Sequence, residues 1–565
     1  MFGQSMRLPS LAATLLLGAL GADAFISARQ LPAEPTRVKT IKTPQNYTIR
    51  YKEPGLEGVC ETTPGVKSFS GYIDIAPDAH TFFWFFEART DPASKPITLW
   101  LNGGPGSDSL IGLFEELGPC RVAPNLTSYI NPHSFSTESN MIFISQPLGV
   151  GFSYATEGNG TINPITGDFQ NASIAGVDGR YPLINATLLD TTDLSAVATY
   201  HALQGILGGL TQLDSNITTR SFNLWTESYG GHYGPAFYDY FYQENLKIAN
   251  GTAKGIHLDF HSLGIGNGII DEVTQAPYYP EFAVNNTYGI KAVNDTVYNY
   301  MKFALNMNNG CLQQIGFCRE TNYTTLIEQS ICAEAENMCR DNVEGLYYAY
   351  SNRGTYDIRV SALEGDAEPP SYYENYVNLP AVQNALGVDL NYTQDANNEV
   401  YYAFQNTGDF VYPNFIDDLE YLLSAGLRVN LYYGDADYIC NWLGGQAVSL
   451  AVNYTHAGQF RAADYVPLTV EGESYGEVRQ AGNFSFVRVF ESGHLVPAYQ
   501  PVAALAMFAR VIHDVDVATG YVPLTAAYNT TGGTANATHT ESTPPSATAT
   551  AAAASWTVVP RSWDS

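Results

Sequence analysis

Ser228 stands at a chain position from which a serine hydroxyl can act as a nucleophile. The stretch TESYGGHYGP at 226–235 carries it between a β-rich run, SFNLW at 221–225, and an amphipathic helix expected to begin near Tyr229. At such a strand-to-helix turn the hydroxyl stands clear of its neighbours, and the next backbone N–H can face a developing oxyanion. The usual motif has glycine where this chain has Thr226, and short Ser-Gly segments are more often structural. The motif alone leaves both interpretations open.

Two later loops supply the partners that a nucleophilic serine needs. The predicted strand RVNLYY at 428–433 ends in a loop with Asp435 and Asp437, and the strand FSFVRVF at 484–490 is followed by His494. Open α/β sheets place their sites in loops at the carboxyl ends of strands. The order Ser, Asp, His is that of the α/β-hydrolases and differs from the order in other serine hydrolase folds. We therefore predict an α/β-hydrolase fold that brings these residues together.

The alternation of strands and helices agrees with this α/β class. Strand-like runs such as HTFFWFFEA, PITLWL, NMIFIS and HSLGIGN alternate with helical segments such as LSAVATYHALQGIL and VAALAMFARVI. The pattern predicts a mostly parallel central sheet flanked by helices. Strand signals stop between about residues 273 and 385, a cysteine-bearing stretch rich in tyrosine and asparagine. We expect this stretch to be a helical cap insertion between two parts of the hydrolase core, at 25–272 and 386–520.

Five further motifs follow one another along the chain. They are WLNGGPGSDSLIGLFEELGP at 100–119, QPLGVGFSY at 146–154, GIGNGIID at 264–271, GDADYICNW at 434–442 and GHLVPAYQP at 493–501. Together with the segment around Ser228 they resemble the serine carboxypeptidases of the S10 family, from about Tyr47 to about Asp514. Within that family the chain resembles the fungal, carboxypeptidase S1-like secreted enzymes.

The resemblance implies a serine-type carboxypeptidase, which releases C-terminal amino acids from peptides and proteins at acidic pH through an acyl-enzyme. It makes Ser228 the nucleophile and His494 the general base and then acid. Asp437 becomes the carboxylate that orients the imidazole, because the family's catalytic aspartate lies three residues before a Cys-Asn pair, here Cys440-Asn441. Asp435 is then expected to be structural.

A glycine-rich turn, Asn102-Gly103-Gly104-Pro105-Gly106, follows the predicted strand ITLWL. A plain turn would account for these residues. The resemblance implies in addition that the backbone N–H groups of Gly104 and Tyr229 form an oxyanion hole. Glycine-rich backbone near a nucleophile suits close approach to the substrate.

An enzyme that removes C-terminal residues must bind a free carboxylate, for which the fork of an arginine would be an obvious choice. The resemblance implies Glu116 and Glu227 instead, with Asn102, the Gly103 N–H and Trp100 in support. Two facing carboxyl groups do not both ionise readily, so one is expected to keep a proton and donate it in a hydrogen bond to the substrate. The alternative interpretation of Glu116 is a solvated charge on a helix face.

Three residues are candidates for the lining of the substrate pocket: Glu115, Cys440 and Leu495. Glu115 stands where some relatives carry an aromatic residue in the pocket for the departing amino acid. A carboxylate there predicts a preference for Lys or Arg. Leu495 stands where methionine is frequent in the family, and Ser107 replaces a cysteine that many members bridge to a distant loop.

Seven cysteines in a chain with a secretory leader indicate disulfides. The resemblance implies a nested pair in the insertion, Cys311 with Cys339 and Cys318 with Cys332, and leaves Cys60 to pair with Cys120. Cys440 is then unpaired. It either lines the site as a free thiol or is simply a small buried residue, and the two interpretations are compatible.

The two ends of the chain predict passage through the secretory pathway. Residues 1–24 read as a signal peptide, with Arg7 before the apolar run LAATLLLGAL and a small-residue cleavage site at Ala22-Asp23-Ala24. Fifteen N-x-Ser/Thr sequons predict N-linked glycans. Residues 521–565 are expected to include a disordered tail rich in Ser, Thr and Ala. We expect a secreted or vacuolar protein with no stable membrane span.

Charge and motif content exclude other classes. With 56 acidic against 27 basic residues the formal charge is −29, so nucleic acid and anionic membranes are not expected as partners. The sequence shows no internal repeat, no metal-ligand cluster and no nucleotide-binding glycine loop, so neither a cofactor nor a metal is expected. Two alternatives remain: an acyltransferase or lyase on the same triad, and an inactive cell-wall glycoprotein or binding module.

Overall fold

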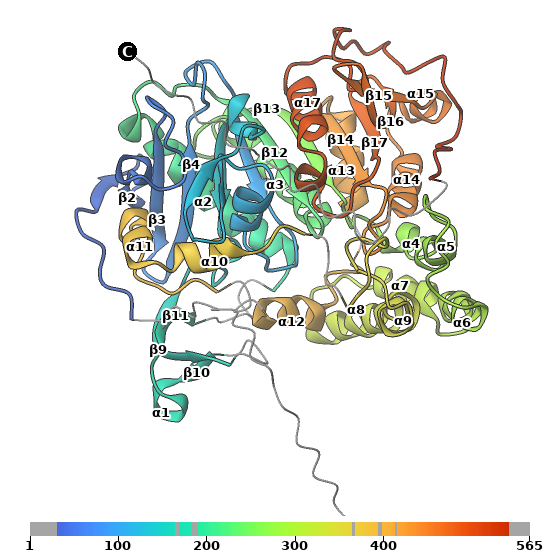
Figure 1. Ribbon diagram of the computed structural model, residues 1–565, viewed down its shortest axis with the longest axis horizontal. Coiled ribbons are helices and arrows are strands. Elements are labelled where there is room, and N and C mark those ends of the chain that lie inside the picture. The colour runs from blue at the N-terminus through green and yellow to red at the C-terminus, as the bar shows by residue number, and fades with distance from the viewer. Residues whose placement is uncertain are drawn as a thin grey trace, which may run out of the picture.

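The computed structural model describes residues 31–163, 169–183, 190–363, 368–393, 398–412 and 415–541 (Figure 1). The predicted signal peptide at 1–24 and the part of the predicted tail beyond residue 541 lie outside these residues. Among the described residues, no helix is long and apolar enough to cross a membrane.

One large sheet forms the centre of the protein, with its strands in the order β1-β2-β3-β4-β8-β5-β12-β13-β14-β17-β16-β15. The strands are β1 (Lys39–Lys42), β2 (Thr48–Lys52), β3 (Ser68–Ala76), β4 (Ala79–Phe86), β5 (Ile97–Leu101), β8 (Asn140–Ile144), β12 (Ser221–Glu227), β13 (Asp259–Gly266), β14 (Arg428–Gly434), β15 (Val466–Val470), β16 (Glu473–Ala481) and β17 (Phe484–Val489). From β8 to β17 the neighbouring strands are parallel, and the strands at both edges are antiparallel. The α/β-hydrolase fold predicted from the sequence is confirmed, and antiparallel strands extend its parallel centre on both sides.

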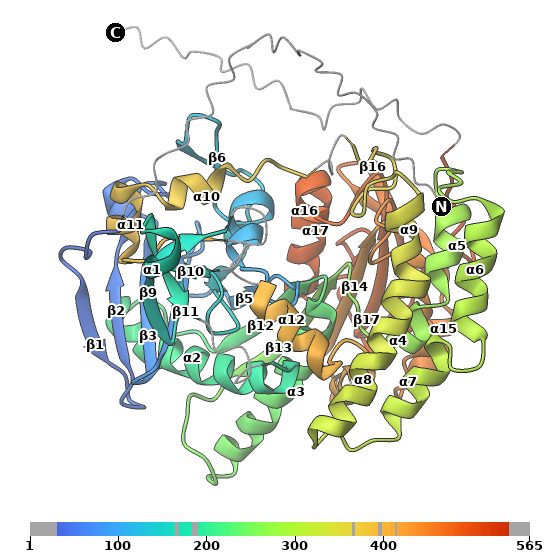
Figure 2. The same cartoon turned by 90° about the horizontal axis from the view of Figure 1, so that it is seen from below.

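Both faces of the sheet are apolar. Successive side chains of a strand point to opposite faces, and the central strands are nearly continuous apolar runs. In β5, Leu99 and Leu101 join one buried core, and Trp100 between them joins the other. Helices α2 (Thr192–Leu213) and α3 (Gly230–Ala249) cover the first face, and α17 (Pro501–Ile512) covers the second. Figure 2 shows α2 and α3 on the opposite side of the sheet from α17.

A helical insertion separates β13 from β14. Its elements are α4 (Glu272–Gln275), α5 (Tyr278–Val284), α6 (Asp295–Asn306), α7 (Cys311–Arg319), α8 (Leu326–Cys339), the π-helical turn Arg340–Glu344, α9 (Gly345–Tyr350), α10 (Tyr372–Val377), α11 (Pro380–Leu386), α12 (Asn398–Thr407) and α13 (Phe415–Ser424). Helices α5 to α9 gather beside the carboxy-terminal half of the sheet (Figure 1). The shorter elements elsewhere are β6 (Cys120–Val122) with β7 (Ser128–Ile130), the sheet of β9 (Thr156–Ile162), β10 (Phe169–Asn171) and β11 (Gly179–Leu183), α1 (Ala172–Ala175), α14 (Trp442–Ala451), α15 (Ala457–Ala462) and α16 (Val496–Tyr499).

Disulfides join the cysteine pairs that the resemblance implied. Two lie within the insertion, where Cys311–Cys339 and Cys318–Cys332 connect α7 to α8. The third, Cys60–Cys120, connects the segment before β3 to β6. Disulfides of this kind form in oxidising compartments.

The start of the predicted disordered tail is ordered in the structure. Asn529 pairs with Ala481 and Thr534 pairs with Tyr465, which adds backbone hydrogen bonds along the edge of the sheet. The Thr530 hydroxyl contacts the backbone carbonyl of Asp464. Backbone pairing and hydroxyl contacts of this kind leave no apolar pattern in the sequence, and composition alone therefore suggested disorder.

Several carboxyl groups are buried without a cation beside them, and this changes how they bind protons. Burial raises the pKa of Asp108 to about 6, that of Asp409 to about 7 and that of Glu115 to about 8. Their residues are 0%, 2% and 6% exposed. In the unfolded chain these groups would titrate near pH 4. Between the pKa values of the unfolded chain and those of the folded protein, from about pH 4 to about pH 8, the folded protein therefore binds more protons than the unfolded chain.

We expect the free energy of unfolding to fall as the pH rises from about 4 to about 8. A pKa that is higher in the folded state contributes stability below the unfolded value, and this contribution is lost as pH rises through the folded value. Urea unfolding at three pH values across this window measures the slope. Asp108→Asn should flatten the slope between about pH 4 and pH 6 whatever its effect on absolute stability. Stability that increases steadily toward pH 8 in the unmodified protein would contradict the expectation.

Candidate active site

Ser228 lies at a sharp turn between β12 and α3, with the backbone in the left-handed region at φ 64°. We call this turn the elbow and α3 the elbow helix. Its N–H donates to the Gly266 carbonyl at 3.0 Å, and its own carbonyl accepts from Gly231 N–H at 2.9 Å. A Cβ on Gly231 would lie 2.2 Å from the Ile269 carbonyl oxygen, so only glycine fits there. Thr226 Oγ1 donates to the Gly230 carbonyl at 2.7 Å and so stabilises the turn from its leading position.

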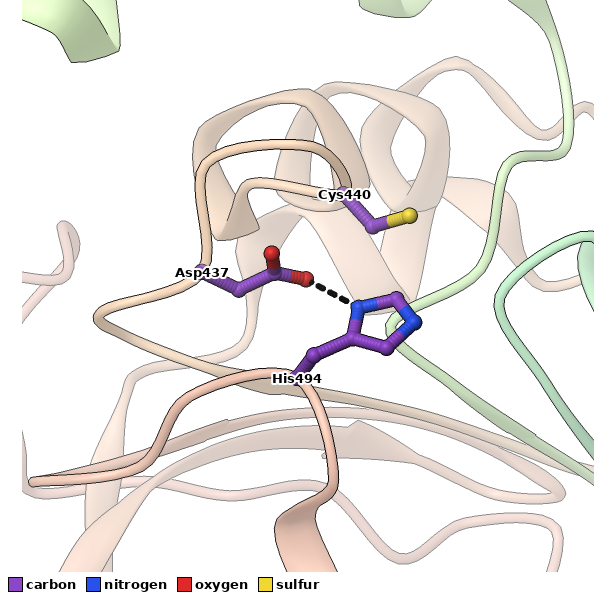
Figure 3. Close-up of side chains that lie close together, drawn as sticks. All are labelled: Asp437, Cys440 and His494. Atoms are coloured by element: carbon purple, nitrogen blue, oxygen red, sulfur yellow. Dashed lines mark hydrogen bonds and ion pairs between the residues drawn. The ribbon is translucent and has the colours of Figure 1, made fainter. Parts of the chain in front are cut away.

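His494 and Asp437 form a buried pair in the loops after β17 and β14 (Figure 3). Asp437 Oδ2 lies 2.7 Å from His494 Nδ1 and also accepts from Asn267 Nδ2 at 2.8 Å. Burial lowers the pKa of His494, but the Asp437 carboxylate more than offsets this and the pKa is raised overall. Asp435 lies elsewhere, where it accepts from the Tyr288 hydroxyl at 2.6 Å. Of the two aspartates that the sequence left as candidates, Asp437 contacts the histidine.

Cys440 lies beside this pair as the one free cysteine among the described residues, and it is buried (Figure 3). Asp437, Cys440 and His494 each offer an atom of a kind that can bind a metal ion, and these atoms lie within 4.8 Å of one another. The Asp437 oxygen that faces His494 is already occupied by two donors. Burial and the nearby Asp437 charge raise the pKa of the Cys440 thiol well above its usual range, and a hydrogen bond with the Ser228 side chain opposes this. The thiol is therefore neutral and in contact with the serine.

The described atoms show no hydrogen bond between the Ser228 hydroxyl and His494. Catalytic hydrogen bonds in substrate-free enzymes are often long and shorten only when substrate binds. Both residues lie beside the Cys440 thiol, which contacts the Ser228 side chain and lies within 4.8 Å of a His494 ring nitrogen.

The glycine-rich turn after β5 packs against the elbow. A Cβ on Gly103 would lie 2.3 Å from the Tyr229 nitrogen, so a side chain there would displace the elbow. Gly104 has a φ of 106°, a conformation that suits glycine. Neither the Gly104 N–H nor the Tyr229 N–H has an acceptor within the described part of the chain. Two unoccupied backbone donors beside a serine can bind a developing oxyanion.

Asn102 links two buried glutamates beside the elbow. Its Oδ1 accepts from Trp100 Nε1 at 2.8 Å and from Gly112 N–H at 2.9 Å, which fixes the orientation of the amide. Its Nδ2 donates to Glu116 Oε1 at 3.2 Å and to Glu227 Oε1 at 3.3 Å. The other oxygen of each glutamate is buried without a partner. The solvated interpretation of Glu116 is excluded, because this residue is 1% exposed.

The two glutamates share one site electrostatically. Burial raises the pKa of both, and the contact between them lowers the pKa of Glu116 while it raises that of Glu227 further. The pair therefore retains a proton above the pH at which a free glutamate would lose it. Arg121 donates to the backbone carbonyls of Glu115 and Glu116 rather than to their carboxyl groups.

Glu115 and Leu495 are both buried. Glu115 lies in the π-helical turn Gly112–Glu116, and one of its carboxyl oxygens has no partner. It lines a cavity of about 190 Å³ together with Phe114, Tyr129, Pro369, Tyr372 and Tyr373. Leu495 directly follows His494 at the start of α16.

Two contacts of the site were not predicted from the sequence. Asn267 holds Asp437, and its position after β13 within the GIGNGIID motif is a signal that could have identified it. Tyr356 packs its ring against His494 at 4.9 Å between centroids, from a segment of the insertion. Nothing in the sequence distinguishes Tyr356 from the other tyrosines of that segment.

A sharp serine turn with a buried histidine and aspartate at the carboxyl edge of a parallel sheet defines an α/β-hydrolase. The serine carboxypeptidase family matches residues 54–514, and the chain belongs to this family. It is 41% identical to carboxypeptidase S1 homolog B of Arthroderma otae, over 92% of this chain and 83% of that protein. It is 37% identical to carboxypeptidase S1 of Penicillium janthinellum, over 80% and 97%.

The fold has a solved counterpart in the Kex1 prohormone-processing carboxypeptidase of Saccharomyces cerevisiae. The two superpose with a TM-score of 0.62 and 21% identity, over 81% of this chain and 94% of that one. This likeness concerns the fold. The family membership makes the protein a serine-type carboxypeptidase, a peptide hydrolase.

Proposed function

We propose that Ser228, His494 and Asp437 are the catalytic triad of this carboxypeptidase. The Ser228 oxygen bonds to the last peptide carbonyl carbon while its proton passes to His494. The backbone N–H groups of Gly104 and Tyr229 bind the oxyanion. His494 then gives its proton to the departing amine, which leaves an acyl-enzyme. Water, deprotonated by His494, attacks that ester, and the shortened peptide leaves as Ser228 regains its proton.

The observation that supports exopeptidase action is the buried glutamate pair held by Asn102 beside the elbow. The protonated carboxyl group of the pair can donate a hydrogen bond to the carboxylate of the substrate, with Asn102 and the Gly103 N–H as further donors. Trp100 fixes Asn102 in place. Peptides and proteins with a free C-terminus are the proposed substrates, and acidic pH keeps the shared proton in place.

We also propose that the protein is glycosylated and secreted or delivered to a vacuole. The sequon residues Asn46, Asn125, Asn322 and Asn453 are exposed, as glycan attachment requires. Asn391 carries a sequon but is 2% exposed, so we do not expect a glycan there. The three disulfides agree with an oxidising compartment.

Replacing Ser228 or His494 with alanine should leave a folded protein whose peptidase activity is lower by about four orders of magnitude or more. The two residues act as one unit, so the double variant should be little worse than either single variant. Release of the C-terminal residue, measured by mass spectrometry, gives the rates. An organofluorophosphonate should label wild-type Ser228. Losses that multiply in the double variant would contradict the shared role.

The shared proton of Glu116 and Glu227 predicts a specific dependence on pH. As the pH rises and the proton leaves, KM for free-acid peptides should increase, by about tenfold per pH unit once the pair is ionised. Peptide amides lack the anion and should show a much smaller increase. The variant with both residues replaced, Glu116→Gln with Glu227→Gln, keeps donors without titration, so its KM for acids should be nearly independent of pH. Identical profiles for acids and amides in both proteins would exclude this pair as the carboxylate site.

Glu115 predicts the preference for the departing residue. If its cavity receives that side chain, Lys or Arg there donates a hydrogen bond to the buried carboxyl group, and its positive charge favours ionisation of Glu115. Glu115→Gln should reduce kcat/KM for C-terminal Lys and Arg by about tenfold and leave C-terminal Leu nearly unchanged. Glu374→Gln is the matched control, because Glu374 influences Glu115 at a distance but does not line the cavity. Equal losses for Lys and Leu in Glu115→Gln would refute this assignment.

A further inference from the structure

A buried carboxylate contacts the residue that follows the nucleophile. Asp409 lies just after α12, where the chain returns from the insertion, and is 2% exposed. Its Oδ2 accepts from the Tyr229 hydroxyl at 2.6 Å and from Thr192 Oγ1 at 2.6 Å. Its Oδ1 accepts from Thr192 N–H at 3.0 Å. Asp409 therefore ties the start of α2 and the start of α3 to the insertion.

Phe410, which follows Asp409, makes a second contact with the elbow helix. The Phe410 carbonyl lies 3.0 Å from His232 Nε2, and His232 Nδ1 faces the Ile269 carbonyl at 2.5 Å. The His232 ring stacks on Tyr229 at 4.4 Å between centroids and packs against Phe415 at 4.2 Å. Tyr229 and His232 are three residues apart and so lie on one face of the first helical turn. Residues 408–410, which we name the return segment, thus contact the elbow helix through both.

The return segment is itself fixed against the disulfide-linked part of the insertion. Gly408 has a φ of 75°, and a Cβ there would lie 2.2 Å from the backbone carbon of Cys332 in α8. Cys332 is bonded to Cys318. A continuous series of contacts therefore runs from the disulfide through Gly408 and Asp409 to Tyr229.

We propose that Asp409 is a positioning residue that fixes Tyr229 so that the Tyr229 N–H points at the oxyanion. The backbone of Tyr229 directly follows the left-handed Ser228, and its N–H has no acceptor among the described residues to hold it in place. The anchoring comes instead from the side chain, whose phenol is fully buried and reaches Asp409. This inference rests on the proposed role of Tyr229 as an oxyanion donor. It adds that the insertion sets the rate of the chemical step through one hydrogen bond.

A purely structural role for Asp409 would affect stability without a selective effect on kcat. The Thr192 contacts offer a separation, because they involve the same carboxylate but not the elbow. Removing the phenol hydroxyl with Tyr229→Phe breaks only the bond to Asp409 and keeps the ring in its stack.

The test is a double-mutant cycle on kcat with Asp409→Ala, which removes the acceptor, and Tyr229→Phe, using a free-acid peptide at a pH where the wild type is active. Each single variant should lower kcat by about tenfold with KM within about twofold, and the double variant should be no worse than the single variants. Thr192→Val should lower the melting temperature and leave kcat within about twofold. Independent, multiplying losses in the cycle, or an equal loss of kcat in Thr192→Val, would overturn the proposal.

Two measurements keep this result separate from the proposed function. Comparing the wild type with Ser228→Ala reports whether the triad releases C-terminal residues at all. The kcat values of the cycle variants are then compared with that of the wild type. If Asp409→Ala does not fold, a pair of glycine variants replaces it. Gly408→Ala should displace Asp409 and lower kcat, whereas Gly426→Ala, which has φ 90° but no atom within 4 Å of a Cβ, should lower stability only. Equal kcat values for both glycine variants would count against the proposal.

Discussion

The left-handed backbone of Ser228 is the constraint on which the site depends. A non-glycine residue in this conformation is strained by about 1–3 kcal/mol and persists only where its surroundings hold it. Here the end of β13 provides much of that support, because the Gly266 carbonyl accepts from Ser228 N–H. The next residue, Asn267, donates to Asp437. One strand end therefore fixes Ser228 and Asp437 relative to each other, and the parallel sheet places both at one edge.

Buried acid groups are the second organising feature, and they connect stability with substrate recognition. Glu116 and Glu227 are held in an apolar layer with Trp100, where two full charges could not be maintained without a cation. The folded protein therefore retains protons, as it does at Asp108, Asp409 and Glu115. In the proposed mechanism, the burial that makes the folded protein more stable in acid also keeps a proton on the glutamate pair for donation to the substrate carboxylate.

How much of this was predictable depends on the kind of contact. The positions of the core strands along the chain, the elbow and the Asp437 and His494 loops follow from local patterns, because a period of two and a loop after each strand are properties of short segments. The choice between Asp435 and Asp437 needed the resemblance, since both follow the same strand. Asn267 could have been identified from its position in the GIGNGIID motif, whereas Tyr356 and Asp409 could not. Their partners lie 138 and 180 residues away in the chain, and no short pattern encodes such a pairing.

The insertion acts on the core in two physically different ways. Its segment around Tyr372 and Tyr373 contributes walls to the cavity of Glu115, where side-chain chemistry decides what fits. Its return segment instead contacts the elbow helix by hydrogen bonds, between Asp409 and the buried Tyr229 hydroxyl and between the Phe410 carbonyl and His232 Nε2. The first set of contacts faces a cavity and tolerates changes of side chain; the second leaves a buried donor unpaired if it is lost, which is costly. If the Glu115 cavity receives the departing residue, as proposed, variation in substrate preference is expected in its walls. The return segment, in contrast, must keep its geometry for Ser228 and Tyr229 to remain in place.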